Sequence, residues 1–365
     1  MPSRRPPYLF LCLLCWLCTG FGPPVLTESD NPRQPWTIHQ IRALRQLPMP
    51  HLTAASALLV DMPTGEVLYA QDEHKRWAPA SLTKIVTALV ALQRGRQDQP
   101  MLVRGSDLQP STAAGLRGGE ELNMRQLLFA LLIPSDNAAS MTIARELAGD
   151  VETFVGWMNE LVTTWGLENT HFANPHGLDD ENGYTTAWDM AIIARQAMQD
   201  PVFADIVGRH EAVVAGRHLE STNKLLNTYP GTIGVKTGTT GQAGENLITM
   251  VDRPEGRAMT VVLGSEDRFS DTRLLMDYYY SNYAELRIDL PESLQNRYLD
   301  ESGTWREFGL REPVTLLIHP WQRGTASFYR RITNIAADPD PDEPIGVLEI
   351  SLNGRYLTEV PLYVR

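Results

Sequence analysis

The stretch APASLTKIVTALVAL (residues 78–92) places a serine and a lysine three positions apart at the start of an apolar helix. Positions i and i+3 share one helix face and Pro79 suits a helix entry, so Ser81 is expected in the first turn with Lys84 beside it. Apolar residues follow Lys84, and a lysine that loses the solvation of its charged form has a lowered pKa. The stretch predicts either a nucleophilic Ser81 with Lys84 as its base, or a capped helix with a solvated lysine. Taken alone, the short motif favours the second interpretation, because such motifs recur by chance.

A second polar stretch, LLIPSDNAAS (residues 131–140), lies between two apolar helix patterns. Its simplest interpretation is a connection between helices with a polar N-cap. The functional interpretation makes the Ser135 hydroxyl a proton relay to a leaving amine and lets Asn137 hydrogen-bond a substrate amide.

A third stretch, GVKTGTTGQAG (residues 234–244), ends an apolar strand with a lysine and a threonine. Glycines such as Gly238 let another backbone approach closely. The stretch predicts an edge strand that pairs with a peptide substrate, with Lys236 and Thr237 holding a carboxylate or relaying protons. A solvated lysine at a strand end is the alternative.

The order of the remaining patterns predicts an α+β fold. From Thr53, two β-rich runs flank a turn signal at residues 63–65, and helical periodicity dominates residues 81–200. Strand patterns return from Gly231, and a last helix is expected through SDTRLLMDYYYSNYAEL (residues 270–286). This order predicts an antiparallel sheet whose first and last strands come from opposite ends of the chain, with helices packed on it.

Beyond residue 288 the patterns are all-β, and Asn353-Gly354 is a type I′ hairpin signal. Two basic residues precede a short apolar run at the N-terminus, as in an export signal. We therefore divide the chain into four expected parts: a signal peptide (1–22), an N-terminal extension (23–50), a catalytic domain (51–287) and a smaller all-β domain (288–365).

Composition limits the cofactors and partners. All three cysteines lie in the apolar run of the signal, so the mature chain is expected to have no disulfide, thiolate or cysteine metal site. The formal net charge of −12 argues against nucleic acid as the main partner. The eight histidines show no metal-binding spacing, and we expect neither a metal nor another cofactor. The protein is expected to be exported to the periplasm or the outer face of the cytoplasmic membrane. An uncleaved signal segment is the alternative to cleavage and would associate the protein with the membrane.

S-x-x-K, S-D-N and K-T-G together, in this order, are the signature of penicillin-binding proteins and class A β-lactamases. The sequence resembles the D-alanyl-D-alanine carboxypeptidases, low-molecular-mass penicillin-binding proteins of serine peptidase family S11, from about Thr53 to its C-terminus. Stretches outside the motifs carry the resemblance too: residues 58–88, 172–195, 221–244, 264–280 and 345–364. The resemblance implies an antiparallel sheet with helices on both sides, followed by a β domain.

The resemblance also implies roles for individual residues. Ser81 would attack the carbonyl between the two terminal D-alanines of a peptidoglycan stem pentapeptide, with Lys84 as base. The N–H groups of Ser81 and Thr239 would form the oxyanion hole, and Ser135 and Lys236 would carry the proton to the departing D-alanine. Thr237 and Arg268 would bind the terminal carboxylate beside Gly238, and Asn137 the substrate amide. β-Lactam antibiotics would acylate the same serine.

Two departures from the family keep alternatives open. Asp136 stands where family members commonly have a small residue and is typical of class A β-lactamases, and the usual C-terminal anchoring helix is missing. A β-lactamase would need a glutamate in an E-x-x-L-N loop, which LENTHFANPHGL (residues 167–178) lacks. A D,D-endopeptidase of peptidoglycan cross-links remains a further alternative, and a non-catalytic wall-binding protein is disfavoured by the intact motif residues.

Overall fold

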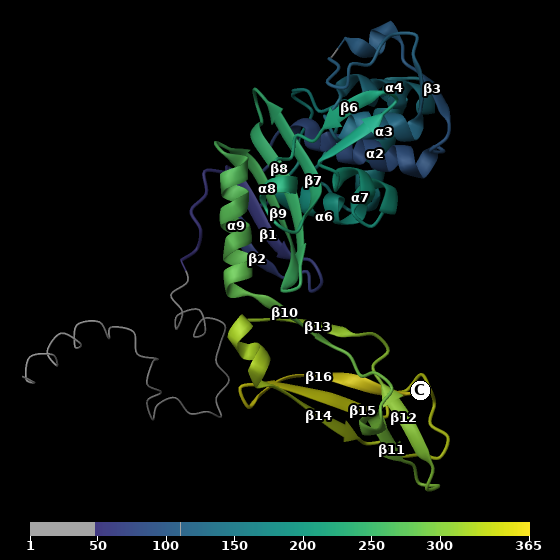
Figure 1. Ribbon diagram of the computed structural model, residues 1–365, viewed down its shortest axis with the longest axis vertical. Coiled ribbons are helices and arrows are strands. Elements are labelled where there is room, and N and C mark those ends of the chain that lie inside the picture. The colour runs from purple at the N-terminus through teal and green to yellow at the C-terminus, as the bar shows by residue number, and fades with distance from the viewer. Residues whose placement is uncertain (1–47, 110) are drawn as a thin grey trace, which may run out of the picture. The chain divides into compact units, whose positions relative to one another are not determined.

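The computed structural model describes residues 48–109 and 111–365. The predicted signal peptide and most of the predicted extension lie outside the described residues. The described chain forms two compact units (Figure 1). The larger contains the described part of Leu47–Leu290 together with Glu312–Arg323, and the smaller contains Pro291–Arg311 and Gly324–Arg365.

The larger unit is built on a five-stranded antiparallel sheet in the order β2-β1-β9-β8-β7. Its strands are β1 (Ser56–Asp61), β2 (Val67–Gln71), β7 (Thr232–Thr240), β8 (Gly244–Arg253) and β9 (Gly256–Ser265). β1 pairs with β9 along its whole length, and the turn between β1 and β2 contains Pro63-Thr64-Gly65. The predicted hairpin and the pairing of strands from opposite ends of the chain are both confirmed.

Side-chain alternation along the central strands explains why both faces of this sheet are covered. Leu58 and Leu59 are neighbours in β1, yet they belong to different hydrophobic clusters. Val261 and Val262 in β9 divide in the same way. Successive side chains of a strand point to opposite faces, so each face carries its own apolar layer and needs its own helices.

One face of the sheet packs against α9 (Arg268–Asn282), and Figure 1 shows this helix running along the strands. The apolar cluster on the other face draws on the remaining long helices: α2 (Thr83–Arg94), α3 (Met124–Leu132), α4 (Asn137–Ala148), α5 (Val151–Thr164), α6 (Ala187–Ala197) and α7 (Pro201–Val207). These helices confirm the helical prediction made from the periodicity of apolar residues. The unit also has a short helix α8 (Leu225–Thr228), a 3-10 turn η2 (Gly105–Leu108), and the small strands β3 (Pro100–Leu102), β4 (Glu121–Asn123), β5 (Glu211–Val214) and β6 (Arg217–Glu220). A further 3-10 turn, η4 (Pro320–Thr325), begins in this unit and ends in the smaller one.

Two local predictions were wrong. Ser81 does not lie in the first turn of the α-helix, because a separate 3-10 turn, η1 (Ala80–Leu82), precedes α2. The last helix ends at Asn282 rather than at residue 286, because the following residues form β10 (Ala284–Ile288), which pairs with β13 (Val314–Ile318). Backbone pairing with a distant strand outweighs the local helical pattern there.

The smaller unit is a five-stranded sheet in the order β11-β12-β16-β15-β14. It comprises β11 (Arg297–Leu299), β12 (Trp305–Gly309), β14 (Ala326–Ile332), β15 (Gly346–Leu352), β16 (Arg355–Val364) and a short turn, η3 (Leu294–Asn296). Asn353 and Gly354 connect β15 to β16 with φ angles of 52° and 71°, as a type I′ turn requires. The predicted hairpin is confirmed, and the α+β class with a separate all-β region is as expected.

Within residues 48–109 and 111–365, no helix has both the length and the hydrophobicity needed to cross a membrane.

Candidate active site

The turn that carries Ser81 is fixed to the central strands of the sheet. The side-chain amide of Asn246, on β8, donates to Ala78 O at 2.9 Å and to Pro79 O at 3.3 Å. Its oxygen accepts from the N–H of Gly264 on β9 at 2.9 Å. Asn246 is fully buried, so these bonds form without competition from water. The position of the serine is therefore set by two neighbouring strands as well as by its own helix.

Lys84 is completely buried and directs its amine at Ser81. The Nζ atom lies 2.8 Å from Ser81 Oγ, 2.7 Å from Asn137 Oδ1 and 2.6 Å from His176 O. An ammonium has three N–H donors, and each has an acceptor here. Burial lowers the pKa of Lys84 to about 7, against a smaller opposing effect from the Asp136 carboxylate. The prediction of a buried lysine with a lowered pKa is confirmed.

The same contacts also suit Lys84 in its neutral form. The neutral amine retains two N–H groups for Asn137 Oδ1 and His176 O, and its lone pair then faces the Ser81 hydroxyl. A pKa near neutrality lets a good share of molecules hold Lys84 in this form, which is the state a general base must start from.

Ser135 and Asp136 of the S-D-N stretch lie in the loop between α3 and α4, and Asn137 is the first residue of α4. Ser135 has a φ of 66°, and its Oγ atom is buried without a hydrogen-bond partner among the described residues. Asn137 is engaged on both sides: its oxygen accepts from Lys84, and its Nδ2 donates to Ser111 Oγ at 2.9 Å. The structure thus brings Asn137 to Lys84.

Asp136, the departure from the family pattern, is an internal brace. Its carboxylate is buried, caps α4 by accepting from Ala139 N at 2.7 Å, and accepts from Ala114 N and Thr112 Oγ1, both at 2.7 Å. Ser111, which accepts a hydrogen bond from Asn137, lies in the same segment as Thr112 and Ala114. Asp136 therefore links residues 111–114 to α4, the helix that begins with Asn137.

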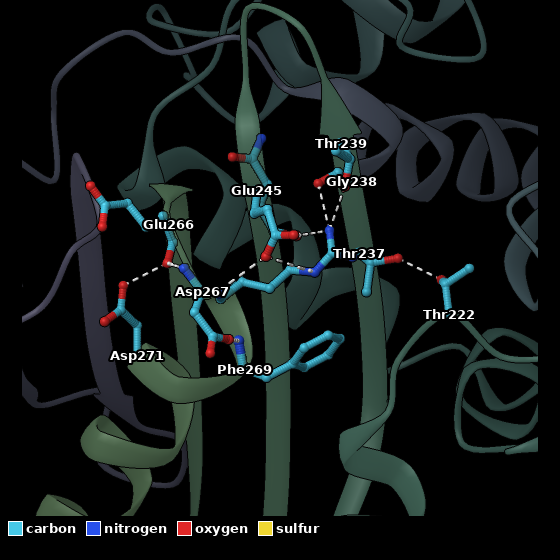
Figure 2. A network of polar contacts seen from close by, with 12 residues as sticks. Thr222, Thr237, Gly238, Thr239, Glu245, Glu266, Asp267, Phe269 and Asp271 are labelled. Carbon is cyan, nitrogen blue, oxygen red and sulfur yellow. Dashed lines mark hydrogen bonds and ion pairs between the residues drawn. The ribbon is translucent and has the colours of Figure 1, made fainter.

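The K-T-G stretch lies on β7, the strand at one edge of the sheet, whose outer side has no neighbouring strand in that sheet. Lys236 is buried, and its amine donates to Thr237 O at 3.1 Å. Burial holds the pKa of Lys236 well below that of an ordinary lysine, and the charges of Lys84 and Arg268 lower it further. The Thr237 hydroxyl shares a hydrogen bond of 2.5 Å with Thr222 Oγ1, which Figure 2 shows.

Gly238 allows this strand to pass directly beside the serine. A Cβ atom added at Gly238 would lie 3.0 Å from Ser81 N, 3.0 Å from Ala80 Cβ and 3.2 Å from Pro79 O. Any side chain here would push the strand away from the nucleophile. The absence of a side chain therefore brings β7 and the Ser81 amide together.

Arg268, the first residue of α9, reaches back to β7. Its Nη1 donates to Gly238 O at 2.9 Å and to Thr239 Oγ1 at 2.6 Å. Burial lowers the pKa of Arg268, while the carboxylates of Glu245 and Asp267 oppose that effect. Arg268, which is predicted to bind the substrate's carboxylate, therefore lies against the strand that carries the K-T-G stretch, and the two belong to one site.

The structure brings Lys84, Asn137 and Gly238 to the Ser81 turn, and it places Arg268 against β7, the strand that carries Lys236, Thr237 and Thr239. A serine beside a buried lysine amine, a second serine hydroxyl without a partner among the described residues, a second buried lysine, Arg268 and an open strand edge can together support acyl transfer to Ser81. Sequence reasoning missed Asn246, the carbonyl of His176 and Glu245 as parts of this site. The only signal for Asn246 was a polar side chain inside the apolar strand pattern ENLITMVD.

In the described part of the chain, no cluster of three or more histidine, cysteine or acidic side chains is arranged to hold a metal ion.

Comparison with known proteins gives one consistent family. The profile of the peptidase S11 family, described as D-alanyl-D-alanine carboxypeptidase, matches residues 44–267. The chain is 29% identical to D-alanyl-D-alanine carboxypeptidase DacF of Bacillus subtilis, over 94% of this chain and 89% of that protein. It is 28% identical to D-alanyl-D-alanine carboxypeptidase DacA of Escherichia coli K12, over 87% of this chain and 84% of that protein.

The fold matches solved structures as well. Penicillin binding protein 5 from Haemophilus influenzae superimposes with a TM-score of 0.70 and 26% identity, covering 87% of this chain and 98% of that one. A D-alanyl-D-alanine carboxypeptidase from Mycobacterium tuberculosis gives a TM-score of 0.60 and 31% identity, covering 63% of this chain and 92% of that one. The first of these matches spans most of the chain, including residues beyond the family profile.

Proposed function

The chain belongs to the D-alanyl-D-alanine carboxypeptidase family, peptidase S11, and we propose from its geometry which residue performs each step of the reaction. The protein is a serine-type carboxypeptidase that removes the terminal D-alanine from peptidoglycan stem pentapeptides through an acyl-enzyme. The observation that carries the assignment of roles is the buried Lys84 amine, 2.8 Å from Ser81 Oγ and with a pKa of about 7.

Acylation begins when neutral Lys84 takes the hydroxyl proton of Ser81. The Ser81 oxygen forms a bond to the carbonyl carbon between the two terminal D-alanines, and the carbonyl oxygen becomes an oxyanion. The N–H groups of Ser81 and Thr239 stabilise that oxyanion; a single such donor is often worth about 3–4 kcal/mol. The close approach of Gly238 to the Ser81 amide supports this arrangement.

Collapse of the tetrahedral intermediate breaks the bond to the leaving nitrogen, which needs a proton. We assign this transfer to Ser135, assisted by Lys236, because the buried Ser135 hydroxyl has no protein partner among the described residues. Water then attacks the acyl-enzyme ester and restores Ser81. Penicillin follows the same first step, with its lactam amide in place of the peptide bond.

Substrate binding uses the edge of β7. The peptide pairs with this strand as an added strand, and its terminal carboxylate lies at Thr237 and Arg268 beside Gly238. Asn137 orients a substrate amide from the other side, where Ser111 already holds its Nδ2 group.

Acylation by a labelled penicillin is expected to depend on pH through Lys84. Protonated Lys84 cannot accept a proton, so the rate constant falls about tenfold per pH unit below pH 7 and levels off above it. His176, whose pKa is lowered to about 4 by burial and by Lys84, stays neutral in this range. Acylation rates measured from pH 5.5 to 8.5 check this, and a flat profile would contradict the role of Lys84.

The products distinguish this activity from its two closest alternatives. The purified protein is incubated with a pentapeptide ending in D-Ala-D-Ala, with a cross-linked peptide dimer, and with penicillin. A carboxypeptidase releases free D-alanine from the first. Cleavage of the dimer without release of D-alanine would make the protein an endopeptidase, and rapid penicillin turnover without release would make it a β-lactamase.

The assignment of the chain's segments is also a proposal. We propose that residues 1–22 export the protein to the periplasm or the outer face of the cytoplasmic membrane, and that the catalytic domain (51–287) is followed by the β domain (288–365), apart from Glu312–Arg323, which belongs to the larger compact unit. The basic residues and apolar run at the N-terminus support export. Cell fractionation with N-terminal sequencing tests it, because an uncleaved segment would leave the protein with the membrane.

A further inference from the structure

Glu245 is an acidic side chain beside the group assigned to the substrate's carboxylate. It lies on β8 directly opposite Thr239 of β7, and Figure 2 shows it next to Thr239 and Gly238. Its Oε2 atom accepts from Arg268 N at 3.3 Å and stands 3.8 Å from Arg268 Nε. The mechanism described above does not use this carboxylate.

The contact between Glu245 and the guanidinium is electrostatic rather than a formed hydrogen bond. A separation of 3.8 Å is too long for an N–H···O bond. Arg268 Nε is buried and has no hydrogen-bond partner among the described residues. The hydrogen bonds from Nη1 to Gly238 O and Thr239 Oγ1 fix the position of the guanidinium without Glu245. Removing the Glu245 carboxylate would therefore change the charge near Arg268 more than the position of Arg268.

The surroundings of Arg268 make the loss of the Glu245 charge important for the binding of an anion. Arg268 is 13% exposed, so its attraction for an anion is only partly screened by water, and Glu245 is 38% exposed. Asp267 adds a second negative charge near Arg268, but its carboxylate caps α9 by accepting from Phe269 N and Ser270 N. A carboxylate bound at Arg268 would stand close to Glu245, and the two like charges would repel each other.

We propose that Glu245 sets the selectivity of this site for the C-terminal group of the substrate, reducing its preference for a free carboxylate over an uncharged terminus such as a carboxamide. The inference rests on the proposed role of Arg268. It makes Glu245 a specificity-determining residue that acts through charge. The structure therefore assigns this enzyme a broader tolerance for peptides lacking a terminal negative charge than Arg268 alone would give.

The test compares two peptides that differ only at the C-terminus, one ending in D-Ala-D-Ala and the other in its carboxamide. Each competes with a fluorescent penicillin, and the inhibition constant is measured from the slowing of acylation. Glu245→Gln is expected to lower the inhibition constant of the acid about 3- to 10-fold and to leave that of the amide unchanged. A fivefold change corresponds to about 1 kcal/mol. Glu245→Asp keeps the charge and is expected to resemble the unmodified protein in both constants.

Glu266→Gln is the matched control because it removes the same charge nearby. Glu266 is exposed, and Figure 2 shows its side chain directed away from Thr239 and Gly238. It is expected to change neither constant.

Equal changes for both peptides, no change, or weaker binding of the acid by Glu245→Gln would overturn the inference. Weaker binding of the acid would mean that Glu245 positions Arg268 instead. Failure of the unmodified protein to react with penicillin would count against the proposed function and the inference together, whereas a reactive protein with an unmoved acid-to-amide ratio would count against the inference alone.

Discussion

Replacing Lys84 by methionine is expected to slow acylation of Ser81 by about 10²- to 10⁴-fold, the usual contribution of a positioned general base. Methionine has a similar length and fills the same buried space, so the variant is expected to fold. Burying an amine that can carry a charge is costly, and methionine removes that cost, whereas Asn137 Oδ1 and His176 O each lose a hydrogen-bond donor, so the two effects on stability oppose each other. Loss of activity without loss of stability would therefore assign the effect to the amine.

The measurement is the second-order rate constant for labelling by a fluorescent penicillin, with thermal unfolding recorded in parallel. Lys84→Arg is expected to be equally slow, because a guanidinium stays protonated and cannot act as a base. Lys75→Ala is the control, since Lys75 is an exposed lysine outside the site, and it should label at the normal rate. A Lys84→Met rate within about tenfold of the unmodified protein would remove Lys84 from the role of base.

Replacing Gly177 by alanine is expected to damage both the fold and the site. A Cβ atom at Gly177 would lie 1.8 Å from Ala80 O, 2.5 Å from Ala80 C and 2.8 Å from Thr83 Oγ1, and the φ of Gly177 is +84°. Either the 176–178 loop or the Ser81 turn must move. The resulting strain and overpacking are expected to cost about 3 kcal/mol of unfolding free energy. Because His176 O holds the Lys84 amine, acylation is expected to slow by about 10²-fold, as for a displacement of about 1 Å.

Gly149→Ala separates the clash from the backbone strain. Gly149 has a φ of +86°, nearly that of Gly177, but an added Cβ there meets nothing within 4 Å. This control is expected to lose about 1 kcal/mol and to acylate normally. Chemical denaturation and penicillin labelling of both variants check the prediction. Equal losses would show that contact with the Ser81 turn has no special importance.

The order of the strand and helix patterns predicted the antiparallel sheet, and the three motifs predicted most of the candidate site, because each of these patterns is local in the chain. The contacts that position the site are not local. Asn246 holds the Ser81 turn from a strand 167 residues away, and Asp136 ties down Ala114, 22 residues earlier in the chain. Such partners have no fixed spacing, so no pattern in one sequence can reveal them.

Contacts between distant segments also explain the two local predictions that were wrong. The helix predicted through residue 286 ends early because β10 pairs with β13, a strand that the local pattern could not connect to it. Pro79 was expected to open an α-helix, but the Ser81 turn lies against β7, and Asn246 of β8 holds it as a separate 3-10 turn. At both places, packing between distant segments outweighed a correct local preference.

The most direct test of the account is a penicillin titration combined with mass spectrometry of the digested protein. The account predicts that stoichiometric penicillin forms an ester on the peptide containing Ser81, that release of D-alanine from a pentapeptide stops in proportion, and that Ser81→Ala shows neither adduct nor release. An adduct on another residue, or continued release of D-alanine from protein fully labelled at Ser81, would contradict it.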